Sequence, residues 1–412
     1  MAPASSGNRS ASSLSLLLAT AIFASASTVA TILLLPALRR RRSPPPGTQE
    51  ESNGGYAALI GNTPLVELQS LSKATGCRIL AKAEYLNPGG TSKDRVALRM
   101  IQEAERAGLL KPGGTVVEGT SGSTGIALAS LCRARGYRCL IVMPDDQAAE
   151  KVRLLQQYGA EVEVVKPAGI ANPNHYYNRA RTRAQELSQM GKNAIFMDQF
   201  ETMANFHTHY HGTGPELWRQ LEEGFGLSPD AFVMSAGTGG TIAGVSRSWK
   251  EMRGKKVVKV YLVDPPGSAL FNKVKFGVCY ASEQKERGVR RHRYDSLAEG
   301  IGLDRVTANF QEARVDDAFR VTDQEAVDMA HFLLQREGLF VGSSTAMNVV
   351  GAVRAAWELG RGHTVVTVLC DSGQRHLTRF WSREWVEGEE KGVRWPERPW
   401  TDLRFLKRVE TE

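Results

Sequence analysis

Short apolar stretches of strand length alternate along the chain with longer stretches of helical periodicity. The first series predicts strands over residues 115–118, 139–142 and 162–165, and helices over residues 124–135 and 146–158. Gly136 and Gly159 follow the two helices, at the position where glycine commonly ends a helix. The resulting strand-helix-strand-helix-strand order predicts a parallel sheet with right-handed crossovers.

A second series of the same kind follows. It predicts strands over residues 231–235, 257–263 and 364–369, and a helix over residues 241–252. Two α/β units favour an active site in the cleft between them. We therefore expect an N-terminal α/β domain over residues 56–203 and a C-terminal α/β domain over residues 204–412.

The first 55 residues have a different character. Residues 14–38 contain no charge and are rich in Leu, Ile, Val and Ala, and Arg39 to Arg42 follow at once. This stretch is long enough to cross a bilayer, so it predicts one transmembrane helix with the catalytic part on the cytosolic side of the arginines. Residues 43–55 then form a linker rich in Pro and Gly. A targeting peptide that is later removed is the alternative.

Composition is that of a sizeable enzyme and excludes several other classes. The 412 residues include 42% hydrophobic side chains and 40 glycines, which is enough for two cores. The net charge of +8 is mild for this length, and the basic stretch 285–293 is interpreted as a solvated loop, so no nucleic acid is expected. The 5 cysteines form no C-x-x-C pair. His207, His209 and His211 alternate in a pattern that fits no metal motif, so no metal is expected.

Lys93 is the first candidate for chemistry. It follows the strand-like stretch 79–85 and the turn Asn87-Pro88-Gly89-Gly90, and it precedes a segment of helical periodicity. A lysine held rigidly at a helix start and away from water can be neutral often enough to attack an aldehyde. The alternative is a surface lysine in a turn, and only other parts of the chain can decide between the two.

The loop Gly119-Thr120-Ser121-Gly122-Ser123-Thr124-Gly125 lies between a predicted strand and a predicted helix. Its small residues leave backbone N–H groups pointing outward at a helix N-terminus, where a carboxylate or a phosphate would be favoured. An ordinary capped turn, which Ser and Thr also favour, is the alternative.

The loop Gly237-Thr238-Gly239-Gly240-Thr241 has the same setting. Two adjacent glycines let the backbone wrap an anion and two threonine hydroxyls add donors, as a phosphate site requires. A dinucleotide site is the rival, with Asp264 as the ribose-binding acid, but Ile242 breaks the G-x-G-x-x-G pattern. The segment 370–373 follows the last strand and offers Ser372 at the same sheet edge. A lysine, a phosphate loop and a hydroxyl at strand ends together suggest pyridoxal phosphate, with Ser372 against the ring nitrogen.

These segments carry a family resemblance. From Tyr56 to Phe380 the chain resembles the cysteine synthase and cystathionine β-synthase family, fold type II of the pyridoxal phosphate enzymes. The segments that match, in the family's order, are residues 59–65 (LIGNTPL), the run around Lys93, the Thr120 loop, residues 199–201 (QFE), residues 237–241 and residues 371–373 (DSG). The N-terminus and the insertion-like stretch 285–294 are similar to a fungal cysteine synthase-like branch associated with mitochondria.

The resemblance implies the fold and the role of each residue. The expected fold is α/β, with two parallel-sheet domains, the active site in the cleft between them, and the transmembrane helix in front. Lys93 would bind the cofactor as a Schiff base and later carry the substrate Cα proton. The implied cofactor-binding residues are Lys93, Ser123, Gly237, Thr238, Gly239, Gly240, Thr241 and Ser372, and the implied substrate-binding residues are Thr120, Ser121, Thr124 and Gln199.

The activity that the resemblance implies is a pyridoxal phosphate-dependent cysteine synthase. It would replace the acetoxy group of O-acetyl-L-serine by sulfide, through an aminoacrylate, to give L-cysteine and acetate. The family usually has Asn where this chain has Ser123, so a contact to the cofactor's 3′ oxygen is in doubt. The alternatives are a cystathionine β-synthase-like or β-eliminating enzyme, and an anchored cofactor-binding protein that has lost synthase activity.

Partners and location follow from the same resemblance. We expect an amino-acid substrate and sulfide, a homodimer, and attachment to a membrane through the N-terminal helix. The mitochondrial outer membrane is the favoured location, with the catalytic part facing the cytosol, and the endoplasmic reticulum is the alternative.

Overall fold

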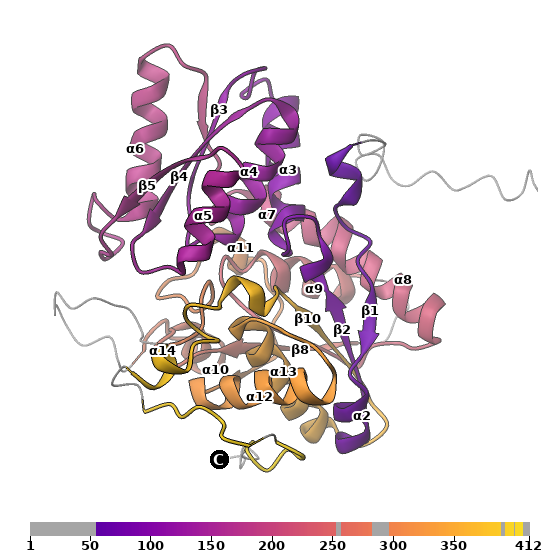
Figure 1. Cartoon of the computed structure of the whole chain (residues 1–412). Coiled ribbons are helices and arrows are strands. Elements are labelled where there is room, and N and C mark those ends of the chain that lie inside the picture. Colours follow the sequence, from indigo (N-terminus) through magenta and orange to yellow (C-terminus); the bar gives the residue numbers. More distant parts are fainter. Residues whose placement is uncertain (1–54, 253–256, 282–295, 389–391, 399, 407–412) are drawn as a thin grey trace, which may run out of the picture. The chain divides into compact units, whose positions relative to one another are not determined.

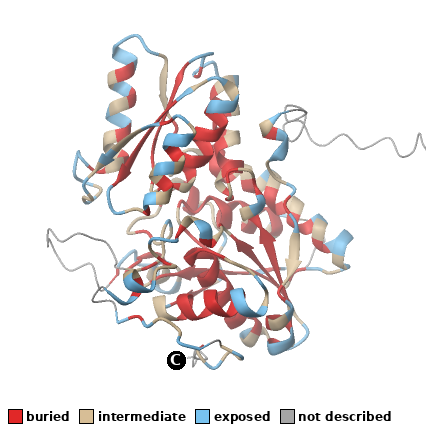
Figure 2. Cartoon of the chain, viewed as in Figure 1, coloured by how far each residue is buried: buried red, intermediate tan, exposed pale blue. Residues whose placement is uncertain are grey.

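The structure is a computed structural model that describes residues 55–252, 257–281, 296–388, 392–398 and 400–406. Two β-sheets organise this part of the chain, one of 4 strands and one of 6 strands. Helices cover both sheets, and the buried residues gather in most of the strands and in the helices that pack against them (Figures 1 and 2). The predicted stretch 285–294 lies outside the described residues.

The smaller sheet has the strand order β5-β4-β3-β6 and is parallel throughout. Its strands are β3 (Thr115–Gly119), β4 (Arg138–Pro144), β5 (Glu161–Val165) and β6 (Ala194–Phe196). Successive side chains point to opposite faces: Val116 packs in one core cluster with Ile126 and Leu128, whereas Val117 packs in another with Ala184 and Leu187. Both faces are therefore covered by helices, which is why the strands read as continuous apolar runs.

The larger sheet has the order β1-β2-β10-β7-β8-β9, in which only β1 runs antiparallel to its neighbour. Its strands are β1 (Leu65–Glu67), β2 (Arg78–Ala83), β7 (Ala231–Ser235), β8 (Lys259–Asp264), β9 (Asp317–Arg320) and β10 (Thr364–Leu369). Leu369 pairs with Ala83, so the segments after β2 and β10 leave the sheet side by side.

Almost every connection between two strands contains a helix. Their bounds are η1 (Tyr56–Leu59), α2 (Gln69–Thr75), η2 (Glu84–Leu86), α3 (Lys93–Arg106), α4 (Ser123–Arg135), α5 (Ala149–Gln157), α6 (Tyr176–Gln189), α7 (Met203–Thr208), the π-helix η3 (His209–Thr213), α8 (Gly214–Phe225), α9 (Gly240–Lys250), α10 (Leu270–Phe276), α11 (Ala308–Gln311), α12 (Asp323–Arg336), α13 (Ser343–Leu359), η4 (Gly373–Arg375) and α14 (Arg383–Glu387). On the smaller sheet α6 covers one face and α4 the other, while α12 and α13 lie together along the larger sheet (Figure 1).

The predicted α/β architecture with parallel sheets is confirmed. The strands expected over residues 231–235 and 364–369 have those bounds in the structure, and the helix α4 ends at Gly136, whose φ of 75° is left-handed. The division at residue 203 stays a prediction. It would assign β1 and β2 to the N-terminal domain, yet both strands pair within the larger sheet.

The expected fold needs one correction, which concerns the predicted transmembrane helix. Residues 14–38 lie outside the described residues, and none of the helices that the structure describes is long and apolar enough to cross a membrane. The longest helix of the described body, α13, has 17 residues and contains Arg354 and Glu358. It would reach only ~26 Å, whereas a bilayer core needs about 20 apolar residues. The fold class that the described residues support is therefore the α/β architecture alone.

The chain after Trp381 packs back on the larger sheet's core. Trp385, Trp395 and Trp400 lie against the cluster formed by α12, α13 and their strands. The Trp400 Nε1 donates to Asp328 Oδ1 at 2.8 Å, so this aromatic tail covers the outer helices of the body.

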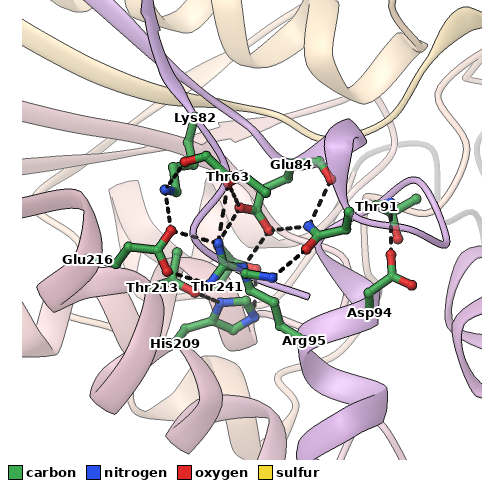
Figure 3. Close-up of polar contacts among 12 residues, drawn as sticks. Thr63, Lys82, Glu84, Thr91, Asp94, Arg95, His209, Thr213, Glu216 and Thr241 are labelled. Carbon is green, nitrogen blue, oxygen red and sulfur yellow. Dashed lines mark hydrogen bonds and ion pairs between the residues drawn. The ribbon is translucent and has the colours of Figure 1, made fainter. Parts of the chain in front are cut away.

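A buried network of charges ties α3 to β2 and α8 (Figure 3). Arg95 donates to both carboxylate oxygens of Glu84 at 2.8 Å, and to both oxygens of Glu216 at 2.8 and 2.9 Å. Lys82 pairs with Glu216 and donates to the Thr63 carbonyl at 2.7 Å. Burial alone would raise the pKa of Glu84, but Arg95 holds that pKa below its usual value. The ionised network therefore fixes the start of α3 in one position.

We predict that Glu84→Gln lowers the free energy of unfolding by about 3–5 kcal/mol, because it removes one partner of a buried ion pair and leaves Arg95 with a single carboxylate. The measurement is denaturant unfolding at neutral pH. Because the folded-state pKa of Glu84 is depressed, its stabilisation is present above the unfolded carboxyl pKa and is lost as pH falls. The difference between wild type and variant should therefore shrink in acid.

The matched control is Glu67→Gln, which breaks the more exposed pair between Glu67 and Arg78 and should cost no more than about 1 kcal/mol. Equal losses in the two variants would contradict a special role for the buried network.

Candidate active site

A cavity of about 490 Å³ lies where segments from both sheets meet. Its walls include Lys93, the loop between β3 and α4, the loop between β7 and α9, and the segment that follows β10. Of the predicted site residues, Lys93, Thr120, Ser121, Ser123, Thr124, Gln199, Gly237, Thr238, Gly239 and Thr241 line this cavity. Residues that the sequence separates by up to about 150 positions are therefore brought together as expected.

Lys93 is the first residue of α3 and is half-buried in the cavity wall. The backbone N–H of Lys93 donates to Thr91 Oγ1 at 3.0 Å, and the backbone N–H of Thr91 donates to Asp94 Oδ2 at the same distance. Gly89 is required in the preceding turn, since a Cβ there would lie 2.0 Å from Asp94 Oδ1. Burial lowers the pKa of Lys93, and a helix N-terminus also disfavours an ammonium group. This amine is therefore disposed to be neutral.

The loop between β3 and α4 is fastened by Gln199. The Thr124 hydroxyl donates to Gln199 Oε1 at 2.5 Å, and Gln199 Nε2 donates to the Gly119 carbonyl at 3.1 Å. Gly122 has a φ of 136°, which favours glycine, and its N–H donates to Thr120 Oγ1 at 3.1 Å. The first turn of α4 then presents its backbone N–H groups to the cavity, as an anion site requires.

The loop between β7 and α9 contains the second anion site. Gly239 caps α9 with a φ of 86°, and a Cβ at this position would lie 2.8 Å from the Phe310 Cα. Thr238 and Thr241 are buried with their side chains in the cavity wall. Gly240 does not line the cavity; a Cβ there would lie 2.0 Å from Asn205 Oδ1, so this glycine allows α9 to approach α7.

Two side chains from α7 and η3 orient these threonines. Asn205 Nδ2 donates to Thr238 Oγ1 at 2.8 Å, which leaves the Thr238 proton for an acceptor in the cavity. His209 Nε2 lies 3.2 Å from Thr241 Oγ1, and His209 Nδ1 lies 2.9 Å from Thr213 Oγ1 (Figure 3). Burial holds the pKa of His209 well below its usual value, so the ring is neutral. His209, one of the three alternating histidines, thus supports the loop between β7 and α9.

The structure separates two of the other predicted residues from the cavity. Ser372 is not among the lining residues; its Oγ accepts the Gln374 N–H at 3.3 Å and caps η4. Its predicted contact with a ring nitrogen stays a prediction. Ser344, in the first turn of α13, lines the cavity beside Cys370 instead. Asp264 was the ribose-binding acid in the alternative hypothesis of a dinucleotide site. It accepts the Phe271 N–H at 2.7 Å and does not line the cavity either.

Sequence reasoning also missed a group of charged residues in the wall. Lys151, Glu299 and His376 line the cavity and contact one another. No local pattern indicated them, because each follows a different strand and Lys151 and Glu299 are 148 positions apart. Asn205 was missed for a similar reason, since it lies in a helix that reaches the threonine loop only in the folded chain.

This arrangement fits pyridoxal phosphate. Glycines, two threonine hydroxyls and the N-terminus of α9 form a donor set for a phosphate, with no carboxylate among Gly237 to Thr241. Lys93 supplies a buried amine with a lowered pKa for the aldehyde. The α4 loop supplies a second anion site in the same cavity. The donors therefore match the phosphate and aldehyde ends of the cofactor and the carboxylate of an amino acid.

Comparisons with known proteins agree with a pyridoxal phosphate site. The family model described as "Pyridoxal-phosphate dependent enzyme" matches residues 56–371. "Cysteine synthase 2" of Neurospora crassa is 54% identical over 335 residues, which cover 79% of this chain and 73% of that protein. "Putative mitochondrial cysteine synthase" of Saccharomyces cerevisiae is 50% identical over 333 residues, which cover 79% of this chain and 84% of that protein.

Among solved structures, that of an O-ureido-L-serine synthase is similar with a TM-score of 0.69 and 29% identity, over 82% of this chain and 97% of that one. The family match spans both loops, Lys93 and the end of β10. The chain thus belongs to the family of pyridoxal-phosphate dependent enzymes.

Proposed function

We propose that the protein is a cysteine synthase that replaces the acetoxy group of O-acetyl-L-serine by sulfide, giving L-cysteine and acetate. The observation that supports it most is the convergence of Lys93, the Thr238 loop and the Thr120 loop on one cavity. Four fungal relatives named as cysteine synthases are 49–54% identical over more than three quarters of the chain, which supports the same activity.

Pyridoxal phosphate, when bound, supplies an aldehyde for amines and an electron sink for the bond that breaks at the substrate Cα. Lys93 would be the amine that holds the cofactor in the absence of substrate. With the substrate bound, Lys93 would take the Cα proton and later return it, because burial keeps its pKa low enough for it to act as a base. Acetate leaves from Cβ, and the sulfide sulfur forms its bond to the same carbon.

The two anion sites orient the reactants. Thr238 and Thr241 donate to the cofactor phosphate. Asn205 donates to the Thr238 hydroxyl and so directs its proton toward the cavity, and His209 lies within hydrogen-bonding distance of the Thr241 hydroxyl. The backbone N–H groups of the Thr120 loop receive the substrate carboxylate, which places Cα within reach of Lys93. Both ends of the Gln199 side-chain amide are bonded to this loop, at Thr124 and at Gly119. Gln199 therefore acts by holding the loop in place.

A mitochondrial location is part of the same proposal. It is supported by the relative in Saccharomyces cerevisiae, whose printed name includes "mitochondrial". A homodimer is the assembly that we expect, since fold type II enzymes are usually dimers.

The absorbance of the protein in visible light tests the function directly. We expect wild type purified with pyridoxal phosphate to show a visible band that Lys93→Ala lacks, and to form cysteine from O-acetyl-L-serine and sulfide at least about 10³-fold faster than Lys93→Ala. A normal band in Lys93→Ala would contradict the role of Lys93. If wild type shows the band but forms no cysteine, the protein binds the cofactor and has another activity.

His209→Leu should weaken the binding of pyridoxal phosphate by roughly 5- to 30-fold, because it leaves the hydroxyls of Thr213 and Thr241 without their shared partner. Fluorescence titration of the cofactor-free protein measures this affinity. His211→Leu is the matched control, since His211 is exposed, and should bind like wild type. Unchanged affinity in His209→Leu would show that Thr241 needs no such support.

Ser123→Asn tests the departure from the family's usual residue. Ser123 is half-buried in the cavity wall at the start of α4, so a longer amide can reach further into the site. We expect kcat/KM for O-acetyl-L-serine to rise by roughly 5-fold, as one added hydrogen bond would give. A fall in kcat/KM, with the cofactor still bound, would mean that this chain is adapted to serine at this position.

A further inference from the structure

A buried cluster of charges lies in the cavity wall away from the phosphate loop. It consists of Lys151, Glu299, His376 and Asp371, and we call it the Lys151–Glu299 cluster. Lys151 Nζ pairs with Glu299 Oε2. His376 Nδ1 lies 3.1 Å from the same Glu299 oxygen, and His376 Nε2 lies 2.9 Å from Asp371 Oδ2. The exposed fractions of the Lys151, Glu299 and His376 side chains are 4%, 8% and 2%.

The members of the cluster come from elements of different sheets. Lys151 lies in α5, which packs on the smaller sheet, whereas Asp371 and His376 follow β10 of the larger sheet. A second contact runs beside the first: Glu150, the neighbour of Lys151, accepts the Thr378 N–H at 2.7 Å and the Thr378 hydroxyl at 2.6 Å. The first turn of α5 is therefore joined to the segment after β10 directly by Glu150, and through Glu299 by Lys151.

Lys151 also packs directly on the Thr120 loop. A Cβ built on Gly122 would lie 2.5 Å from the Lys151 Cδ, so the methylenes of this lysine fill the space above the loop backbone. Gly300, the neighbour of Glu299, also lies near this loop, since a Cβ there would lie 4.0 Å from Ser121 Oγ. The loop that receives the substrate carboxylate therefore adjoins both the lysine and the segment that carries its ion-pair partner.

The charges of the cluster are mutually stabilised. Burial would favour neutral Glu299, but Lys151 and His376 hold its pKa well below the usual value. Burial would also favour neutral His376, but Asp371 and Glu299 raise its pKa to about 9. At neutral pH Glu299, Asp371 and His376 are therefore ionised, and loss of one charge of the cluster leaves another buried and uncompensated.

We propose that Lys151 is a positioning residue for the amino-acid substrate: its ion pair with Glu299 and its packing on Gly122 hold the Thr120 loop ready for the substrate carboxylate. This inference rests on the proposed function, in which that loop binds the α-carboxylate. Lys151 touches neither the phosphate loop nor Lys93 in this role, so its loss should affect the substrate and leave cofactor binding intact.

The test compares the full chain, loaded with pyridoxal phosphate, as wild type, Lys151→Met, Glu299→Gln and the double variant. Met keeps the methylenes against Gly122 and removes only the ammonium group. We expect the KM for O-acetyl-L-serine and the Kd for L-serine to rise roughly 10-fold in each single variant, with kcat changed less than about 2-fold. The double variant should be no worse than the single ones, because both remove the same interaction. The affinity for pyridoxal phosphate should stay at the wild-type value.

Lys166→Met is the matched control, because Lys166 pairs with Asp145 near the same helix but is 86% exposed. It should leave KM and Kd unchanged. The inference is overturned if Lys151→Met binds L-serine like wild type, or if cofactor affinity and thermal stability fall while KM does not rise. Should Lys151→Met fail to fold, Glu299→Gln decides by the same criteria. Wild-type protein that binds no amino acid would instead refute the proposed function, and the inference with it.

Discussion

Arg95 is the residue on which the geometry of the active site depends most. Its guanidinium binds two carboxylates at once, Glu84 after β2 and Glu216 in α8, with two hydrogen bonds to each. Lys93 lies two residues earlier on the same first turn of α3. Because the planar guanidinium fixes distance and orientation together, the turn that carries the lysine cannot shift without breaking charge-assisted bonds in a buried place. Such a network adds little net stability, but it specifies one position.

The Lys151–Glu299 cluster differs in what it joins. The Arg95 network connects α3 with β2 and with α8, which packs beside β1, whereas the second cluster connects α5 to segments that follow β8 and β10. It also involves a lysine and a histidine, whose bonds are less directional than those of a guanidinium. The first cluster therefore suits the fixed position of the catalytic lysine. The second suits a loop that must accept and release a substrate.

Much of the site could be predicted from the sequence because its chemistry lies at the ends of strands. The glycines at 122 and 239 mark loops whose backbone must adopt positive φ, and such positions are visible in a single sequence. Residues such as Asn205 and Lys151 were not predictable, because their partners are supplied by the folded chain from other strands. Ser372 differs from both: its hydroxyl caps a short helix and does not line the cavity, so its contact with a ring nitrogen stays a prediction. The transmembrane prediction depended on the length and apolar composition of residues 14–38 and on the arginines that follow, and no helix of the described body supports it.

The helices α3, α4 and α9 begin at the cavity, with Lys93, Ser123 and Thr241 of their first turns in its wall. Each N-terminus contributes a partial positive charge, which together with burial disfavours the ammonium form of Lys93. An anionic phosphate at α9 and a carboxylate at α4 would offset two of these partial charges. The proton affinity of Lys93 should therefore be lowest in the empty cavity, when a neutral amine is needed to react with the cofactor aldehyde, and higher once both anions are in place, when Lys93 must accept the Cα proton. His209 is compatible with this sequence because it supports Thr241 as a neutral ring and adds no fixed charge.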